Sequence, residues 1–276
     1  MRVALTIAGS DSSGGAGIQA DLKTFAALGV YGTSAITAIT AQSTVGVLEA
    51  VALSADLVTA QIEAVAGDID IHATKTGMLA DAAIVEAVAA AIKELDLPLV
   101  VVDPVIASTR GDRLLDDDGV QMLCAELLPL AHVVTPNIPE AEALSGRRIA
   151  SLEDMRKAAR RIHEMGARAI IITGGHLSLA TEPRPPGAAP GPPAEIVDLL
   201  FDGREFREFR TVRIDTPNTH GTGCTFAAAV AAHLALGHGL AAAAERSQQY
   251  VVGAIRHALA IGHGHGPLHH FWTPSA

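Results

Sequence analysis

The chain has 276 residues, of which 30 are acidic and 20 basic, so its formal net charge is −10 at pH 7. This balance, without a basic run, argues against nucleic acid as a partner, and any phosphate must be bound by local backbone geometry. Two cysteines are too few for a disulfide framework and are typical of a reducing compartment. The apolar run at the start ends at Gly9, too early for a signal peptide, and no apolar stretch reaches membrane-spanning length. We therefore expect a cytoplasmic protein.

Short apolar runs bounded by turn residues alternate with longer segments of helical period. The predicted strands cover residues 4–8, 32–39, 73–76, 99–102, 132–135 and 169–172. The predicted helices cover about 15–28, 55–66, 82–95, 119–127 and 152–165. This order predicts an α/β fold in one domain over residues 1–276, with a mainly parallel central sheet and helices on both of its faces.

The rhythm breaks at residues 178–194, which hold six prolines among glycine and alanine. Such a segment cannot sustain a helix or a central strand, so we expect an exposed loop, either a surface insertion or a flap over the site. The runs 195–202 and 205–212, separated by Gly203, predict a hairpin.

The segment 216–224, Thr-Pro-Asn-Thr-His-Gly-Thr-Gly-Cys, runs directly into the apolar segment 226–236. The first turn of a helix has unpaired N–H groups and the positive end of the macrodipole, so anions and thiolates are stabilised there. The alternative for Cys224 is that it packs as a small apolar residue, as we expect for Cys124. The loop favours phosphoryl transfer, with a phosphoryl group held by the amides of Gly221, Thr222, Gly223 and Cys224.

After the first predicted strand, residues 9–17 are rich in glycine and serine, and Asp21 follows one helical turn later. Gly15, Gly17 and Ala20 have the spacing of a dinucleotide fingerprint, but no acidic residue stands about 20 positions further on, and the glycine that a Walker loop requires is missing. Two interpretations remain: a wall along which a small substrate approaches the backbone, with Asp21 as a polar handle, or a simple strand-to-helix turn.

Carboxylates follow two other predicted strands, at Asp103 and at Glu140. In a parallel sheet these positions meet at one edge, and the pair could hold Mg²⁺ through waters while the metal also bridges phosphates. Taken singly, Glu140 is also explained as the acidic residue of a helix N-terminus after Pro139. For the histidines near the end of the chain we expect structural or solvated roles rather than a metal site: His263, His265, His269 and His270.

Taken together, these motifs resemble those of the hydroxymethylpyrimidine/phosphomethylpyrimidine kinases of thiamine biosynthesis, within the ribokinase-like superfamily. The matching segments run in the family's order from end to end, at residues 4–11, 14–23, 39–42, 75–79, 135–137, 174–176, 218–224 and 264–267. The resemblance implies a homodimeric kinase that uses MgATP to phosphorylate 4-amino-5-hydroxymethyl-2-methylpyrimidine, and then its monophosphate. It also implies Cys224 as the base. Its position agrees with this role, because a helix N-terminus lowers the pKa of a thiol toward neutrality.

The resemblance also assigns binding residues by position. It places the pyrimidine against Gly9, Ala16, Asp21, Gln42, Met78 and Val105. It places ATP and its phosphates against Asn137, Glu140, Asn218 and His220, and the metal near Asp103 and Glu140.

Two positions depart from the family's pattern, since Thr173 and Pro217 stand where its members commonly carry lysine. A missing ammonium weakens phosphate contacts unless another cation replaces it. Two other functions stay open: a pyridoxal or pyridoxine kinase of the same superfamily, and a non-catalytic pyrimidine-binding protein. Gln42 and Met78 favour the aminopyrimidine.

Overall fold

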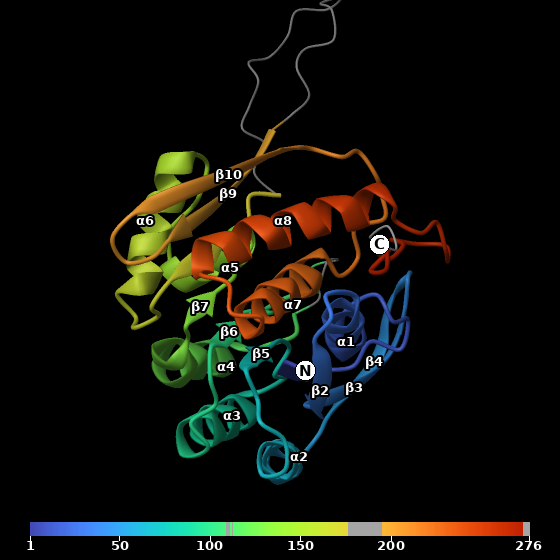
Figure 1. Cartoon of the computed structure of the whole chain (residues 1–276), viewed down its shortest axis with the longest axis vertical. Helices are drawn as coiled ribbons and strands as arrows, with labels where there is room; N and C mark the ends of the chain where they lie inside the picture. Colours follow the sequence, from blue (N-terminus) through green and yellow to red (C-terminus); the bar gives the residue numbers. More distant parts are fainter. Residues whose placement is uncertain (109–110, 112, 176–194, 273–276) are drawn as a thin grey trace, which may run out of the picture.

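The computed structural model describes residues 1–108, 111, 113–175 and 195–272, and places an eight-stranded sheet at the centre of the molecule (Figure 1). The strand order is β10-β9-β8-β7-β6-β5-β1-β2. Six neighbouring strands are parallel: β1 (Val3–Ala8), β2 (Tyr31–Ile36), β5 (Ala73–Thr76), β6 (Val100–Val102), β7 (Val133–Val134) and β8 (Ile170–Ile172). Next to β8, β9 (Glu195–Phe201) pairs antiparallel with it, and β10 (Phe206–Val212) pairs antiparallel with β9. The predicted parallel sheet and the predicted hairpin are both confirmed.

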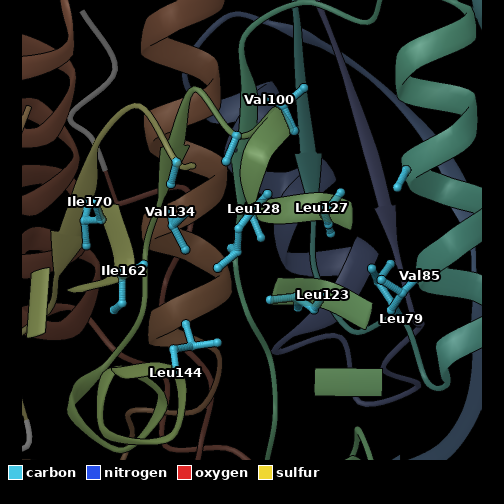
Figure 2. Packing of buried hydrophobic residues seen from close by; sticks show 14 of the residues in the cluster. Leu79, Val85, Val100, Leu123, Leu127, Leu128, Val134, Leu144, Ile162 and Ile170 are labelled. Carbon is cyan, nitrogen blue, oxygen red and sulfur yellow. The ribbon is translucent and has the colours of Figure 1, made fainter. Parts of the chain in front are cut away.

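Helices cover both faces of the sheet because alternate strand residues point to opposite sides. Ile170 and Ile172 belong to one apolar cluster, and Ile171 between them belongs to the other. The first cluster packs under α2 (Ala55–Ala66), α3 (Ala82–Glu94), α5 (Ile138–Ser145) and α6 (Leu152–His163). Figure 2 shows part of it, with Val100 and Val134 from the strands beside Leu123 and Leu127. The second packs under α1 (Gly17–Ala27), α7 (Thr222–Ala235) and α8 (Leu240–Arg256), of which α7 and α8 lie side by side (Figure 1).

The prediction of one strand over residues 32–39 is wrong, because the chain leaves the large sheet at Thr37. The amide of Thr37 donates to the carbonyl of Ala8 at 3.1 Å, and its hydroxyl donates to the carbonyl of Met78 at 2.6 Å. After it, β3 (Ala38–Ser43) and β4 (Gly46–Ala52) form a separate two-stranded sheet at the edge of the molecule (Figure 1). This hairpin was not predicted from the sequence.

Two helical segments also differ from expectation. The predicted helix over 119–127 is α4 (Asp117–Met122) followed by a wider π turn, Leu123–Leu127. The long helix α8 was not predicted, because it buries small and polar residues such as Ser247 and Gln248, which weakens the apolar period. The prediction for residues 178–194 lies outside the described residues. Within the described part of the chain, none of the helices has the length and apolar character that a membrane span requires.

Candidate active site

A cavity of about 790 Å³ opens where the parallel strands end, bounded by the loop after β1, the small sheet β3–β4 and the first turn of α7. Convergence at this edge follows from the topology, since every parallel strand delivers the loop after it to the same side. Most of the predicted site residues line this cavity, from five or more separate segments: Gly9, Ala16, Gln42, Met78, Asp103, Val105, Asn137, Glu140, His220, Gly221, Thr222, Gly223 and Cys224. Asp21 and Asn218 do not line it.

The loop before α7 bends sharply against the glycine-rich loop after β1. Gly221 has φ +82°, and a Cβ there would lie 1.8 Å from the carbonyl oxygen of Gly15. No side chain caps the N-terminus of α7, and the amide of Thr222 makes only a long hydrogen bond, to the carbonyl of Thr219 at 3.3 Å, so the first turn can present N–H groups to an anion. The predicted phosphoryl cradle therefore lies at the wall of the cavity, and its role stays a prediction.

We expect Gly221→Ala to lower the stability of the fold by about 1–3 kcal/mol, because a left-handed backbone is strained for alanine and the new methyl group meets the Gly15 carbonyl. Gly223→Ala is the matched control, since a Cβ there meets no atom within 4 Å. Thermal unfolding of the two variants checks this, and equal melting temperatures would contradict the close packing of the two loops.

A buried ion pair stands behind the cavity wall. Asp21 and Lys75 are both 0 % exposed, and Lys75 Nζ donates to Oδ2 of Asp21 at 2.9 Å. The hydroxyl of Thr6 donates to the same oxygen at 2.6 Å. Because this face of α1 is turned toward the sheet, Asp21 does not fit the predicted contact with the pyrimidine, and we assign it instead to anchoring Lys75.

Lys75 was not predicted as a site residue, although it lines the cavity. Its Nζ lies 3.8 Å from Oδ2 of Asp103, and its charge also acts on Cys224. The signal was a lysine inside a short predicted strand of the central sheet, since lysine is almost never fully buried unless it is paired. Lys75 therefore links the buried ion pair to Asp103 and Cys224 at the cavity wall.

Asp103 and Glu140 are both buried, and the charge of Asp103 acts on the carboxyl of Glu140. Burial raises the pKa of Asp103 to about 6, with Lys75 opposing and Asp21 adding to the rise. Burial, then the charge of Asp103, raises the pKa of Glu140 to about 8. Oδ2 of Asp103 has no hydrogen-bond partner among the described residues. Glu140 also completes a capping box, in which its carboxylate accepts the Asn137 amide at 2.9 Å and its own amide donates to Oδ1 of Asn137 at 3.0 Å.

The model of a family described as phosphomethylpyrimidine kinase matches residues 11–269. The chain belongs to this family. It is 48% identical over 268 residues to the hydroxymethylpyrimidine/phosphomethylpyrimidine kinase of Bacillus subtilis, covering 97% of this chain and 94% of that protein. It is also 48% identical over 266 residues to the thiamine biosynthesis bifunctional protein ThiED of Geobacter sulfurreducens, covering 96% of this chain but only 51% of that protein's length. A solved structure of Bacillus subtilis pyridoxal kinase with ADP superposes with a TM-score of 0.86 at 39% identity, covering 98% of this chain and 97% of the other.

In this phosphomethylpyrimidine kinase chain the Cys224 thiol does not have the lowered pKa that its helix position predicts. Burial raises the pKa of Cys224 to about 12; Lys75 lowers it, while Asp103 and Asp21 raise it. Burial, followed by the charges of Asp103 and Asp21, outweighs the lowering by Lys75 and by the backbone amide of Gly17. The prediction of a thiol near neutrality is therefore wrong for the protein without its ligands.

The two remaining predicted phosphate residues have structural partners. Oδ1 of Asn218 accepts a hydrogen bond from the backbone amide of Gly266 at 3.1 Å, which connects the C-terminal loop to the loop before α7. The ring of His220 is buried and meets Oδ2 of Asp11 at 2.8 Å. The other C-terminal histidines form no metal cluster within the described residues; His265 contacts the carbonyl of Pro217, and His270 contacts the hydroxyl of Thr225.

Lysine was expected at positions 173 and 217, and among the described lining residues of the cavity two side chains are lysine or arginine, Lys75 and Arg213. Thr173 lines the cavity and cannot supply a charge, and Pro217 does not line it. The side chain of Arg213 is exposed and lines the same cavity.

Proposed function

We propose that this protein uses MgATP to phosphorylate 4-amino-5-hydroxymethyl-2-methylpyrimidine to its monophosphate and then to its diphosphate, in thiamine biosynthesis. The observation that carries the proposal is the position of Cys224, in the first turn of α7 and beside the carboxyl of Asp103, in a cavity that also presents Gln42 and Met78. Relatives that are 48% identical over nearly their whole length are named as kinases of this substrate and its phosphate.

Phosphoryl transfer requires positioning and charge stabilisation more than covalent chemistry from the protein. The hydroxymethyl oxygen attacks the terminal phosphorus of ATP as the bond to the bridging oxygen breaks, and the attacking oxygen loses its proton. In this proposal Cys224 accepts that proton as its thiolate, a form that a cation at Asp103 would favour by neutralising one of the two carboxylates that raise the pKa of the thiol. The amides of Gly221, Thr222 and Gly223 donate to the oxygens of the transferring group. The ammonium of Lys75 favours the thiolate form of Cys224.

The pair Asp103 and Glu140 fits a divalent cation. Burial raises both pKa values, and a cation would stabilise the charged form of both carboxylates as well as meet the unpartnered Oδ2 of Asp103. No group of three or more acidic, histidine or cysteine side chains that could hold a metal is found in the described parts of the chain, so phosphate oxygens and water would complete the coordination. Mg²⁺ held there would neutralise charge on the phosphates of ATP.

Pyridoxal phosphorylation is the second candidate, favoured by the similarity to the Bacillus subtilis pyridoxal kinase structure. Mass-spectrometric analysis of products distinguishes the two, after incubation of the protein with MgATP and, separately, hydroxymethylpyrimidine, its monophosphate and pyridoxal. We expect mono- and diphosphate from the pyrimidine series. Product from pyridoxal alone would show instead that the protein phosphorylates a vitamin B6 compound. No product from any of the three substrates would favour a non-catalytic pyrimidine-binding protein.

We further propose a homodimer that works in the cytoplasm, where ATP is available. The outer face of the small sheet β3–β4 supports the dimer, because it exposes apolar side chains: Ile39 47%, Leu48 87% and Val51 54%. A second copy of this chain would cover that face. We expect light scattering to give twice the mass of the chain, and Leu48→Lys to shift the protein toward the monomer; a wild-type monomer would contradict the proposal.

A further inference from the structure

Asp11, His220 and Gln42 form a hydrogen-bonded chain along the wall of the cavity. They come from three separate segments: the loop after β1, the loop before α7, and β3. Nε2 of His220 lies 2.8 Å from Oδ2 of Asp11 and 3.4 Å from Nε2 of Gln42. The question is which of these atoms carry hydrogens, because that decides what Gln42 presents to a bound ring.

Asp11 determines the hydrogen on His220. Its Oδ1 accepts the amide and the hydroxyl of Ser13 at 2.8 and 2.7 Å, and its Oδ2 accepts the amides of Gly15 and Ala16 at 3.1 and 2.8 Å. An oxygen surrounded by donors in this way is an acceptor; burial raises the pKa of Asp11, but hydrogen bonds from His220, Ser13 and Ala16 bring it down to about 2. Nε2 of His220 therefore bears a hydrogen and donates it, whether the ring is neutral or charged.

Thr40 constrains Gln42 from the other side. The single hydroxyl hydrogen of Thr40 is donated to the carbonyl of Ser10 at 2.8 Å. The side-chain oxygen of Thr40 can therefore only accept a hydrogen from the Gln42 amide, which lies 3.4 Å away. Both contacts require the same orientation, with the amide oxygen toward His220 and the amide NH₂ toward Thr40. A protonated Nε2 of His220 has no lone pair to accept from an NH₂ group, and its one hydrogen is shared between Oδ2 of Asp11 at 2.8 Å and the amide oxygen of Gln42. Oxygen and nitrogen of a carboxamide are assigned by such partners.

We propose that Asp11 and His220 are positioning residues that hold the carboxamide of Gln42 in this one orientation, so that the enzyme selects rings with an amino group next to a ring-nitrogen acceptor. A fixed carboxamide pairs at two points with a donor and an acceptor that lie side by side, as glutamine pairs with adenine. A 4-aminopyrimidine has that edge, and pyridoxal carries no amino group beside its ring nitrogen. The inference rests on the proposed function and explains how its substrate is selected.

The test compares hydroxymethylpyrimidine with its analogue that lacks the amino group. In the wild type we expect kcat/KM to favour the amino compound; in His220→Phe, which keeps a ring but loses the donor, we expect this preference to fall about tenfold, mainly through KM. His220→Gln retains an N–H donor and is expected to keep most of the preference. Calorimetric binding of the two pyrimidines without nucleotide should follow the same order. His265→Phe is the matched control, because His265 contacts Pro217 and not Gln42.

Gln42→Glu tests the same point if His220→Phe does not fold, because a carboxylate accepts from the amino group but cannot donate to the ring nitrogen. Loss of preference in this variant supports the inference. Equal losses of kcat/KM on both pyrimidines in His220→Phe would overturn the inference. So would a wild type that phosphorylates both pyrimidines equally well, although that outcome leaves the proposed function standing. A wild type with no turnover of hydroxymethylpyrimidine would overturn the proposed function, and the inference with it.

Discussion

Cys224→Ala is expected to reduce the rate of the first phosphorylation by about 100- to 10,000-fold, the usual contribution of a positioned general base, while the second phosphorylation loses far less. The two steps have different nucleophiles. A hydroxymethyl oxygen must lose a proton as it attacks, whereas a phosphate monoester has a second pKa near 6 and is largely ionised at neutral pH. Single-turnover kinetics with hydroxymethylpyrimidine and with its monophosphate measure the two steps separately.

Cys124→Ala is the matched control for this experiment. Cys124 is half-buried beside the apolar cluster under α3, it does not line the cavity, and burial raises its pKa as it does that of Cys224. Its replacement should leave both steps close to the wild-type rates. Equal losses in the two steps for Cys224→Ala would remove the base assignment and leave the cysteine a packing role at the start of α7.

The alternation of strands and helices could be predicted because several of the parallel strands, such as β1, β6 and β8, are apolar runs closed by turn residues. The small sheet could not, because residues 31–43 form one nearly continuous β-prone stretch, and the break at Thr37 depends on hydrogen bonds to Ala8 and Met78, which are remote in sequence. Helix α8 escaped prediction for a related reason. Its Gln248 is buried because its amide meets Asp198 and the carbonyl of Phe209, and such partners are visible only in the fold.

The cavity lining could be predicted largely from motifs at the strand ends, but the directions of the side chains could not. Asp21 follows a glycine-rich loop and has the sequence position of a ligand, yet it points to Lys75 inside the protein. Cys224 has the sequence position of an activated thiol, yet its pKa is set by burial and by the charges of Lys75, Asp103 and Asp21. Both differences come from the charges of Asp21, Lys75 and Asp103, which α1, β5 and the end of β6 bring together. These contacts join residues that are distant in sequence, so the local sequence does not predict them.

Lys75→Met is expected to lower the free energy of unfolding by about 3–5 kcal/mol, because it leaves a carboxylate uncompensated in the protein interior. Asp21 and Lys75 are both fully buried, and Asp103 lies 3.8 Å from the same ammonium. Removing one member of such a group costs more than removing the pair, so the double variant Asp21→Asn, Lys75→Met should recover part of the loss. Urea unfolding followed by circular dichroism measures the three proteins.

An exposed ion pair supplies the control for Lys75. Lys93 Nζ lies 2.8 Å from Oε2 of Glu126, a shorter contact than that of Lys75 with Asp21, but these side chains are 49% and 43% exposed. Lys93→Met should therefore cost less than about 1 kcal/mol, since water already solvates the charge that it leaves behind. If the two lysine variants lost equal stability, distance rather than burial would govern these pairs, and the assignment of Asp21 as the anchor of Lys75 would fail. A large loss of stability in Lys75→Met alone, partly recovered when Asp21→Asn is added, would show that Asp21 and Lys75 serve to compensate each other's buried charge close to Cys224.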